Sequence, residues 1–295
     1  MLYGKKETID KIMNDAHKIA NEKGYEIVFG AVQGSISRGL ERRDSDYDIR
    51  FLYKKNSPIH KINNNYCENE VVYRYYPNEC SIYDKIAFWE IGAFCSFLER
   101  PEMDSKGISV GLYNQFFWTF SSPYVWDPYG LVQKIMPIAN SVINIKYLYE
   151  YFLKYIEERI DILENDDVIL REYVYLSLCI LQLKWLMKYS SYPPLYYMSL
   201  MTCCDEQKIQ QIIIEYVEKL KNIANNEEVL QMKKFSKIQV KQNEYLTSWI
   251  QNFYEKAKNN YNDYQSDICL DEIKLKMQEI QNIIELSLKK GCNII

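Results

Sequence analysis

The sequence predicts a two-part protein, in which an α/β (α+β) domain with a small mixed sheet and flanking helices is followed by an all-helical domain. Two observations lead to this fold class. Nine of the ten glycines and six of the eight prolines lie at or before Pro137, and both residue types mark turns. Long segments beyond that point show apolar residues at helical spacing. We therefore expect an α/β domain over residues 1–128 and a helical domain over residues 129–295.

The first part is predicted to be a helix followed by four strands, with helices after them. Apolar residues recur on one face of residues 6–23, and Gly24 ends that helix. Apolar runs bounded by turn residues then predict the strands. These strands are 25–32, 46–53, 70–76 and 83–89. The helices that we expect to follow are near 90–99 and 108–120.

The second part is predicted to hold five helices. They are expected at 141–163, 168–189, 205–224, 240–258 and 270–290. The adjacent prolines Pro193 and Pro194 break the run after the second of these. That helix contains the most apolar stretch, but a glutamine and two lysines interrupt it, and it is too short to span a bilayer. We therefore expect a buried helix and no membrane partner.

Composition excludes several classes of function. A hydrophobic fraction of 47% with 26% charged residues is typical of a globular protein. The net charge of −4 argues against a general nucleic-acid coat protein, though not against a local basic groove. The two histidines, His17 and His60, cannot build a three-histidine metal site.

The eight cysteines and the start of the chain indicate a reducing compartment. No CxxC pair and no zinc-ligand spacing occurs. The chain begins MLYGKKETIDKIM, which contains no apolar signal region. We therefore expect a cytoplasmic protein with free thiols, in which the neighbours Cys203 and Cys204 are ordinary thiols rather than a redox switch.

One segment has the features of a phosphate-binding and metal-binding site. It reads VFGAVQGSISRGLERRDSDYDIRFLY, so that an apolar strand leads into Gly34 and Ser35, and a second strand carries Asp46 and Asp48. Gly34 permits a tight turn, and the amides after it with the Ser35 hydroxyl can hold phosphate oxygens. Alternate residues of a strand face the same side, so the two aspartates project together. Two such carboxylates repel unless a cation lies between them, and Mg²⁺ suits carboxylate and phosphate oxygens.

This segment resembles the polymerase-β-like nucleotidyltransferase superfamily, whose signature is a strand, Gly-Ser, a spacer and Asp-x-Asp on the next strand. Its longer form, GSISRGLERRDSDYDIRFLY, resembles one branch, the bacterial and phage family of predicted nucleotidyltransferases associated with RNA repair. The segment REYVYLSLCILQLKWLMKYSSYPPLYYMSLM (171–201) is similar to the helical, Tyr-rich segment of that family. The resemblance is dense at 30–53 and fainter over most of the remainder.

The resemblance implies a role for each matching residue. Gly34 and Ser35 would hold the β- and γ-phosphates, and Asp46 and Asp48 would hold two Mg²⁺ ions. Family members need a third carboxylate on a later strand, which holds the nucleophile-side metal and activates the attacking hydroxyl. We assign this role to Asp84, at the start of the fourth predicted strand. The rival residue is Glu90, which we expect to begin the following helix.

Four neighbouring residues complete the set. Arg50 shares a strand face with the two aspartates, where it would contact the triphosphate or neutralise their charge. Ser37 and Arg38 match the GSxSRG pattern of the family, which implies nucleotide contact for both. Asp44 is expected to cap a turn through its side chain, which is a structural role.

These residues predict Mg²⁺-dependent transfer of a nucleoside monophosphate from an NTP to an acceptor hydroxyl, with pyrophosphate leaving. We expect the NTP to be ATP, and the family association implies an RNA end as the acceptor. Two other classes stay open, namely an enzyme that AMPylates a protein hydroxyl and a catalytically silent nucleotide-binding module. A small-molecule acceptor such as an aminoglycoside is a further enzymatic option.

Overall fold

The structure is a computed structural model of the 295-residue chain. The residues that it describes are 6–42, 45, 47–55, 70–71, 85–99, 108–222, 238–261 and 269–291. The chain packs into two compact units, which we call the sheet unit (Met1–Ser37, Ser45–Ile143 and Ile268–Ile295) and the helical unit (Arg38–Asp44 and Asn144–Asp267). A domain boundary between residues 128 and 129 stays a prediction, because compact packing does not establish which segments fold independently.

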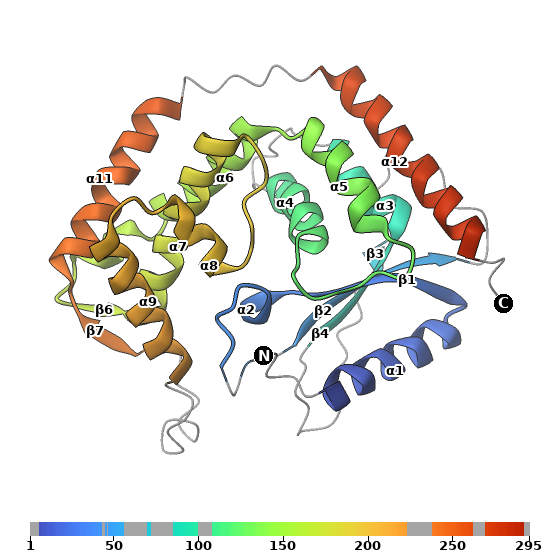
Figure 1. The fold of residues 1–295 in the computed structure, drawn as a ribbon, viewed down its shortest axis with the longest axis horizontal. Coiled ribbons are helices and arrows are strands. Elements are labelled where there is room, and N and C mark those ends of the chain that lie inside the picture. Colours follow the sequence, from blue (N-terminus) through green and yellow to red (C-terminus); the bar gives the residue numbers. More distant parts are fainter. Residues whose placement is uncertain are drawn as a thin grey trace. The chain divides into compact units, whose positions relative to one another are not determined.

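The sheet unit is built on a mixed five-stranded sheet, in the order β3-β4-β2-β1-β5, of which β1, β2, β3 and β4 are labelled in Figure 1. Its strands are β1 (Tyr25–Val32), β2 (Asp48–Lys55), β3 (Glu70–Val71), β4 (Lys85–Glu90) and β5 (Val125–Trp126). β2 runs parallel to β4, and the other neighbouring pairs are antiparallel. The small mixed sheet is therefore confirmed.

Helices cover both faces of this sheet (Figure 1). Helix α1 (Lys6–Glu22) presents Ile12, Ala16 and Ala20, which are buried in one core cluster with residues of β1, β2 and β4. On the opposite face, α4 (Ile108–Phe120) contributes Phe120, whose ring centroid lies 5.1 Å from that of Phe29. The predicted helices at 6–23 and 108–120 are therefore confirmed.

The last helix of the chain also belongs to the sheet unit. Helix α12 (Leu270–Gly291) packs against α5 (Leu131–Ser141), α3 (Ile91–Cys95) and the 3₁₀ turn η2 (Ser96–Glu99). Its inward face is apolar and follows helical spacing. The buried apolar residues of the described part of α12 are Ile273, Met277, Ile280, Ile284 and Leu288.

The helical unit is centred on α7 (Leu170–Tyr189), which is buried along most of its length, as predicted. The other helices in the described part of this unit are α6 (Ile145–Glu157), α8 (Tyr197–Leu200), α9 (Gln207–Asn222) and α11 (Glu244–Asn260). A 3₁₀ turn, η3 (Ile160–Glu164), follows α6, and another, η4 (Met201–Cys203), lies between α8 and α9. No described helix combines the length and the apolar composition that a membrane-spanning segment requires.

The prediction of an all-helical second part is wrong in one place. Strands β6 (Asp167–Ile169) and β7 (Gln239–Lys241) form a two-stranded antiparallel ribbon in the helical unit. The valines at the centre, Val168 and Val240, face each other and are buried, which suits β-branched side chains. The helices predicted at 168–189 and 240–258 therefore each begin with a short strand.

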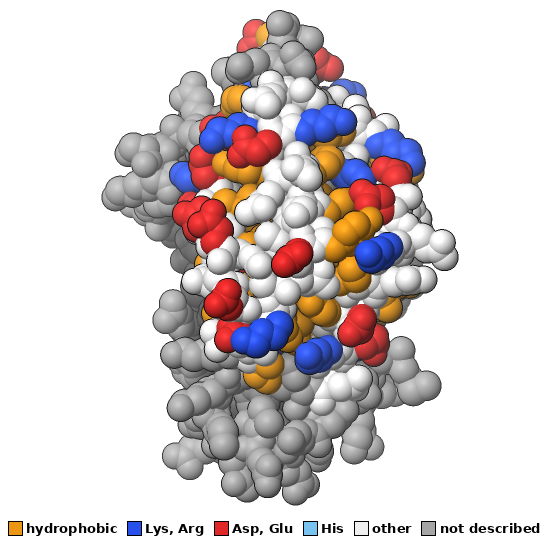
Figure 2. Space-filling view, turned by 90° about the vertical axis from the view of Figure 1, so that its left-hand side faces the viewer, with side chains coloured by type: hydrophobic (Ala, Val, Ile, Leu, Met, Phe, Trp, Pro, Cys, Tyr) orange, Lys and Arg blue, Asp and Glu red, His pale blue; other side chains and the backbone are white. Residues whose placement is uncertain are grey.

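Positive and negative side chains are interspersed on the face that carries α11 and the β6–β7 ribbon. Lysine and arginine side chains alternate there with aspartate and glutamate, and apolar side chains lie between them (Figure 2). This distribution agrees with the near balance of charge in the sequence. Charge alone therefore does not identify a ligand surface on this face.

Candidate phosphate and metal site

The Gly-Ser turn lies directly after β1, where hydrogen bonds fix the end of the strand. The Val32 amide donates to the Tyr124 carbonyl (3.0 Å), and the Gln33 amide donates to the Asp48 carbonyl (2.7 Å). The Ser122 hydroxyl donates to the Val32 carbonyl at 2.6 Å. Because these hydrogen bonds fix Val32 and Gln33, the Gly-Ser turn begins at a defined position.

Gly34 and Asp48 are in direct contact, which joins the two halves of the sequence motif. Gly34 opens the one-turn helix α2 (Gly34–Ser37) with φ 70°, in the left-handed region that favours glycine. A Cβ atom at this position would lie 2.7 Å from the Asp48 Oδ2. The residue must therefore be glycine for two reasons, and the Asp48 carboxylate lies against its α-carbon.

The two serines of the turn have different surroundings. The Ser37 hydroxyl donates to the Gly34 carbonyl at 3.0 Å, and the side chain is buried, so it stabilises the turn. Ser35 is half-buried, and its hydroxyl donates to the Ser45 hydroxyl at 3.1 Å. This contact ties the turn to the segment that leads into β2. Of the two hydroxyls, the Ser35 hydroxyl is the better placed for a phosphate.

Arg50 follows Asp48 on the same face of β2. Its guanidinium carbon lies 5.8 Å from the ring centroid of Trp89 on β4, in a cation–π contact. Both Asp48 and Arg50 are half-buried. The strand therefore presents a carboxylate and a guanidinium side by side, next to the Gly-Ser turn.

Two of the three predicted metal-binding carboxylates, Asp46 and Asp84, lie outside the described residues, as does Asp44. Asp84 precedes Lys85, which pairs with Asp48 in the parallel register of β2 and β4. The rival residue Glu90 is buried and caps α3, where its Oε2 accepts from the Ala93 amide at 2.7 Å. Glu90 lies five residues beyond Lys85 on β4, so the two are roughly 16 Å apart at the usual strand rise. The register therefore places Glu90 far from Asp48, and the choice of Asp84 as the third carboxylate stays a prediction.

The donor set suits a hard divalent cation. Carboxylate oxygens are the ligands that Mg²⁺ prefers, and the predicted ligands are all aspartates. In the described part of the chain, no group of three or more His, Cys, Asp or Glu side chains is arranged to hold a metal. Asp48 is thus the one predicted ligand whose side chain is placed, and it fits by chemistry and by its position beside the Gly-Ser turn.

Arg38 and Gly39, the continuation of the motif, pack within the helical unit. The Tyr197 amide donates to the Arg38 carbonyl at 3.0 Å. Gly39 has φ 74°, and a Cβ atom there would overlap the Tyr196 ring. Tyr196 and Tyr197 belong to the Pro-Pro-Leu-Tyr-Tyr segment, so two segments that resemble the same family are in contact. The contact between Gly39 and Tyr196 could not be predicted from local sequence patterns, because about 160 residues separate the two in the chain.

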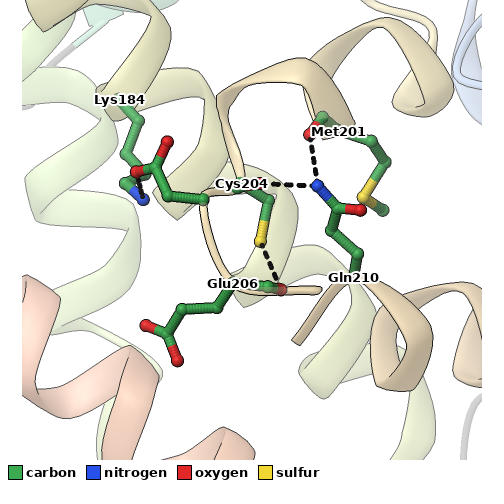
Figure 3. Close-up of polar contacts among 6 residues, drawn as sticks. Lys184, Met201, Cys204, Glu206 and Gln210 are labelled. Atoms are coloured by element: carbon green, nitrogen blue, oxygen red, sulfur yellow. Dashed lines mark hydrogen bonds and ion pairs between the residues drawn. The ribbon is translucent and has the colours of Figure 1, made fainter. Parts of the chain in front are cut away.

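Hydrogen bonds of Cys204 and Gln210 fix the chain at the start of α9 (Figure 3). The Gln210 side chain donates to the carbonyls of Met201 (3.3 Å) and Cys204 (2.6 Å), and the Cys204 thiol donates to the Glu206 carbonyl at 3.6 Å. Cys203 and Cys204 are free and buried, and burial raises the pKa of both thiols. They are therefore protonated and poor nucleophiles at neutral pH, as expected for ordinary thiols.

Comparison with known proteins identifies the family. The model of the RNA repair pathway DNA polymerase beta family matches residues 116–275, which is more than half of the chain. The chain belongs to this family. It is also 21% identical over 195 residues to the uncharacterized protein YcgL of Bacillus subtilis (strain 168), an alignment that covers 65% of this chain and 68% of the relative. The matched residues of the family model include the Tyr-rich segment 171–201.

Proposed function

We propose that the protein transfers a nucleoside monophosphate from an NTP, which we take to be ATP, to the hydroxyl of an RNA end. The single observation that carries this proposal is the contact between Gly34 and Asp48. It brings a turn suited to phosphate oxygens against a carboxylate suited to Mg²⁺. Membership of an RNA repair family with a polymerase-β name supports both the reaction class and the RNA acceptor.

The residues of the sheet unit would have separate roles in phosphate binding, proton transfer and metal binding. The amides after Gly34 and the Ser35 hydroxyl hold the β- and γ-phosphates, and Arg50 stabilises charge on the triphosphate. Asp84 orients the attacking hydroxyl and accepts its proton, so that the oxygen attacks the α-phosphorus in line and pyrophosphate leaves. Two Mg²⁺ ions held by Asp46, Asp48 and Asp84 would supply charge stabilisation. Contacts of Ser37 and Arg38 with the nucleotide stay predictions.

A double substitution tests this proposal. The protein is incubated with an α-labelled NTP, Mg²⁺, and either an RNA pool or a protein lysate. We expect label in RNA with the native protein and none with Asp46→Asn/Asp48→Asn, because that variant lacks the metal-binding carboxylates. The matched control is Asp271→Asn, which makes the same chemical change at an exposed position of α12. Circular dichroism checks that both variants fold.

Each outcome decides between the reaction classes. Undiminished transfer by the double variant would show that the two aspartates are not the metal site. Label in protein instead of RNA would favour the AMPylating class. Tight NTP binding with no label in either acceptor would favour a silent nucleotide-binding module.

A further inference from the structure

The end of helix α7 presents an aromatic pair to solvent. The ring centroids of Trp185 and Tyr189 lie 4.4 Å apart, and the indole nitrogen of Trp185 donates to the Ser191 hydroxyl at 3.2 Å. Ser190 has φ 47°, in the left-handed region, and α7 ends directly after Tyr189. Tyr189 is 44% exposed, and the Lys188 Nζ lies 5.1 Å from its ring centroid. An open ring and an ammonium group therefore lie together at this end of the helix.

Two more lysines of the same unit lie over aromatic rings. The Lys208 Nζ on α9 lies 4.0 Å from the ring centroid of Tyr245 on α11, and Tyr245 is 42% exposed. The Lys184 Nζ on α7 lies 5.8 Å from the ring centroid of Trp249, which follows Tyr245 by one turn of α11. These contacts join α7, α9 and α11 along one surface. We call this surface the Lys–aromatic band, and its residues are Lys184, Lys188, Tyr189, Lys208, Tyr245 and Trp249.

Two carboxylates at the start of α9 lie beside the band and limit its positive charge. The Lys184 Nζ lies 2.9 Å from the Asp205 Oδ2, so these two charges neutralise each other. Glu206 is exposed, and its Oε2 accepts from the hydroxyl of the band tyrosine on α11 at 2.9 Å. Lys188 and Lys208 are exposed and lie over rings. They are therefore the ammonium groups that an anionic ligand can reach, with Glu206 opposing them.

Single-stranded RNA matches this combination of groups. Ammonium groups pair with phosphates, and exposed tyrosine rings stack on unpaired bases of any sequence. A duplex keeps its bases stacked inside, so it would contact the lysines alone. An acidic peptide would likewise use the lysines and leave the rings without a partner. The residues matched by the RNA repair family model, 116–275, contain all six positions of the band, which supports RNA as the ligand.

We propose that the Lys–aromatic band binds single-stranded RNA, with bases stacked on Tyr189 and Tyr245 and phosphates held by Lys188 and Lys208. That this RNA is the acceptor rests on the proposed nucleotidyl transfer, whereas RNA binding by the band does not. Because only two ammonium groups meet phosphates, stacking supplies most of the affinity. The slope of log affinity against log salt should therefore be shallow, about −1.4, at roughly 0.7 for each phosphate neutralised on a single strand.

Binding of a fluorescein-labelled, mixed-sequence RNA of about 12 nucleotides to the full-length protein, followed by anisotropy without NTP or Mg²⁺, tests the stacking. We expect Tyr189→Ala to weaken binding about tenfold, because one base loses the ring on which it stacks. Tyr189→Phe is the matched control, since it keeps the ring and should bind within about twofold of the native protein. Circular dichroism checks that both variants fold.

Two substitutions of opposite effect test the charge of the band. Lys208→Ala removes a cation, so it should weaken binding and reduce the salt slope by about 0.7. Glu206→Gln removes the opposing carboxylate, and its amide oxygen can still accept from the tyrosine hydroxyl, so it should tighten binding. The matched control for Lys208→Ala is Lys219→Ala, at an exposed position further along α9 and outside the band. It should leave affinity and salt slope unchanged.

Several results would overturn the proposal. They are no binding of the RNA by the native protein, unaltered binding by Tyr189→Ala, an equal loss in Lys208→Ala and Lys219→Ala, and duplex binding as tight as single-strand binding.

The outcomes for this site and for the proposed reaction are separable. If RNA binds through the band while the Asp46→Asn/Asp48→Asn test fails, the RNA site stands and the reaction does not. If label reaches RNA but Tyr189→Ala leaves both RNA affinity and the KM for RNA unchanged, the reaction stands and this site does not. We expect Tyr189→Ala to raise the KM for RNA and to leave the KM for NTP unchanged.

Discussion

At the scale of single residues, the candidate site depends on one close approach. The Asp48 carboxylate occupies the space that any side chain at Gly34 would need. The glycine therefore sets the position of the carboxylate as well as the shape of the turn. This position has a positive φ and a contact with Asp48. The effects of the two can be separated by comparing Gly34 with Gly24, which has a positive φ alone.

Gly34→Ala should abolish most of the activity while the protein stays folded. A residue with a Cβ atom at positive φ costs about 1–2 kcal/mol of stability, and the new methyl group must also displace the Asp48 side chain. We expect labelled-NTP transfer to fall at least about a hundredfold, since misplacement by 1 Å can cost that much. Thermal unfolding followed by circular dichroism measures the loss of stability.

Gly24→Ala provides the control for Gly34→Ala. Gly24 has φ 68°, but nothing lies within 4 Å of a Cβ atom there. It should lose a similar amount of stability and keep full activity. Equal activity in the two variants would show that Asp48 does not need its present position.

Sequence alone predicted the parts of the site that are close together in the chain. Gly34, Ser35 and Asp48 follow from a strand–turn–strand pattern, and the structure places Gly34 and Asp48 in contact. Contacts with distant residues left no local signal. Tyr196 packs on Gly39, and Arg50 makes a cation–π contact with Trp89. Both contacts depend on the tertiary fold, because each joins residues that are far apart in the chain.

At the scale of elements, predictions succeeded where periodicity was long. Strand β1 and helix α4 have the predicted bounds, and β2 begins two residues later than expected. Helix α5 was missed because Pro137 lies inside it, and proline normally ends a helix. The β6–β7 ribbon was missed because three-residue strands are too short for alternation to be recognised.

Tyr261 should make the stability of the α6–α11 pair sensitive to alkaline pH. Its hydroxyl donates to the Glu150 Oε2 at 2.9 Å, and burial together with this carboxylate raises the pKa of Tyr261 to about 12. The unfolded tyrosine ionises near pH 10. Between about pH 10 and 12 the unfolded state therefore loses a proton that the folded state keeps, and stability falls as pH rises.

Tyr261→Phe isolates this effect. At pH 8 the variant should be less stable than the native protein by about 0.5–1.5 kcal/mol, because one hydrogen bond is lost. The difference should shrink as pH rises from 10 to 12, because phenylalanine does not titrate. Urea unfolding at pH 8, 10 and 11.5 measures it, and a difference that stays constant with pH would contradict the assignment.

At the scale of the whole molecule, the chain is not two consecutive pieces. Residues after 143 form the helical unit, and then α12 returns to the sheet unit. Periodicity predicted a helix at 270–290 and its apolar face, but a helical pattern does not say which partner that face will meet. Compact units need not coincide with independently folding domains, so the predicted boundary between residues 128 and 129 stays a prediction.

Ile280→Ala tests the contribution of α12 to the sheet unit. Ile280 is fully buried, so the cavity should cost about 2–5 kcal/mol of unfolding free energy. The control on the same helix is Leu275→Ala, whose side chain is 68% exposed and whose removal should change stability by less than about 0.5 kcal/mol. Urea unfolding followed by tryptophan fluorescence measures both, and equal costs would contradict the packing of this helix.

The return of α12 has a consequence for protein synthesis. The ribosome completes the helical unit before it reaches Leu270–Gly291. The sheet unit therefore cannot complete its packing until α12 has been made. At about 5–20 residues per second, the interval between Ile143 and Gly291 is roughly 7–30 s. During that time the apolar surface of α5 and η2 that α12 later covers has no permanent partner. Over that interval the nascent chain exposes apolar surface, which is the condition under which chaperones that shield such surface bind.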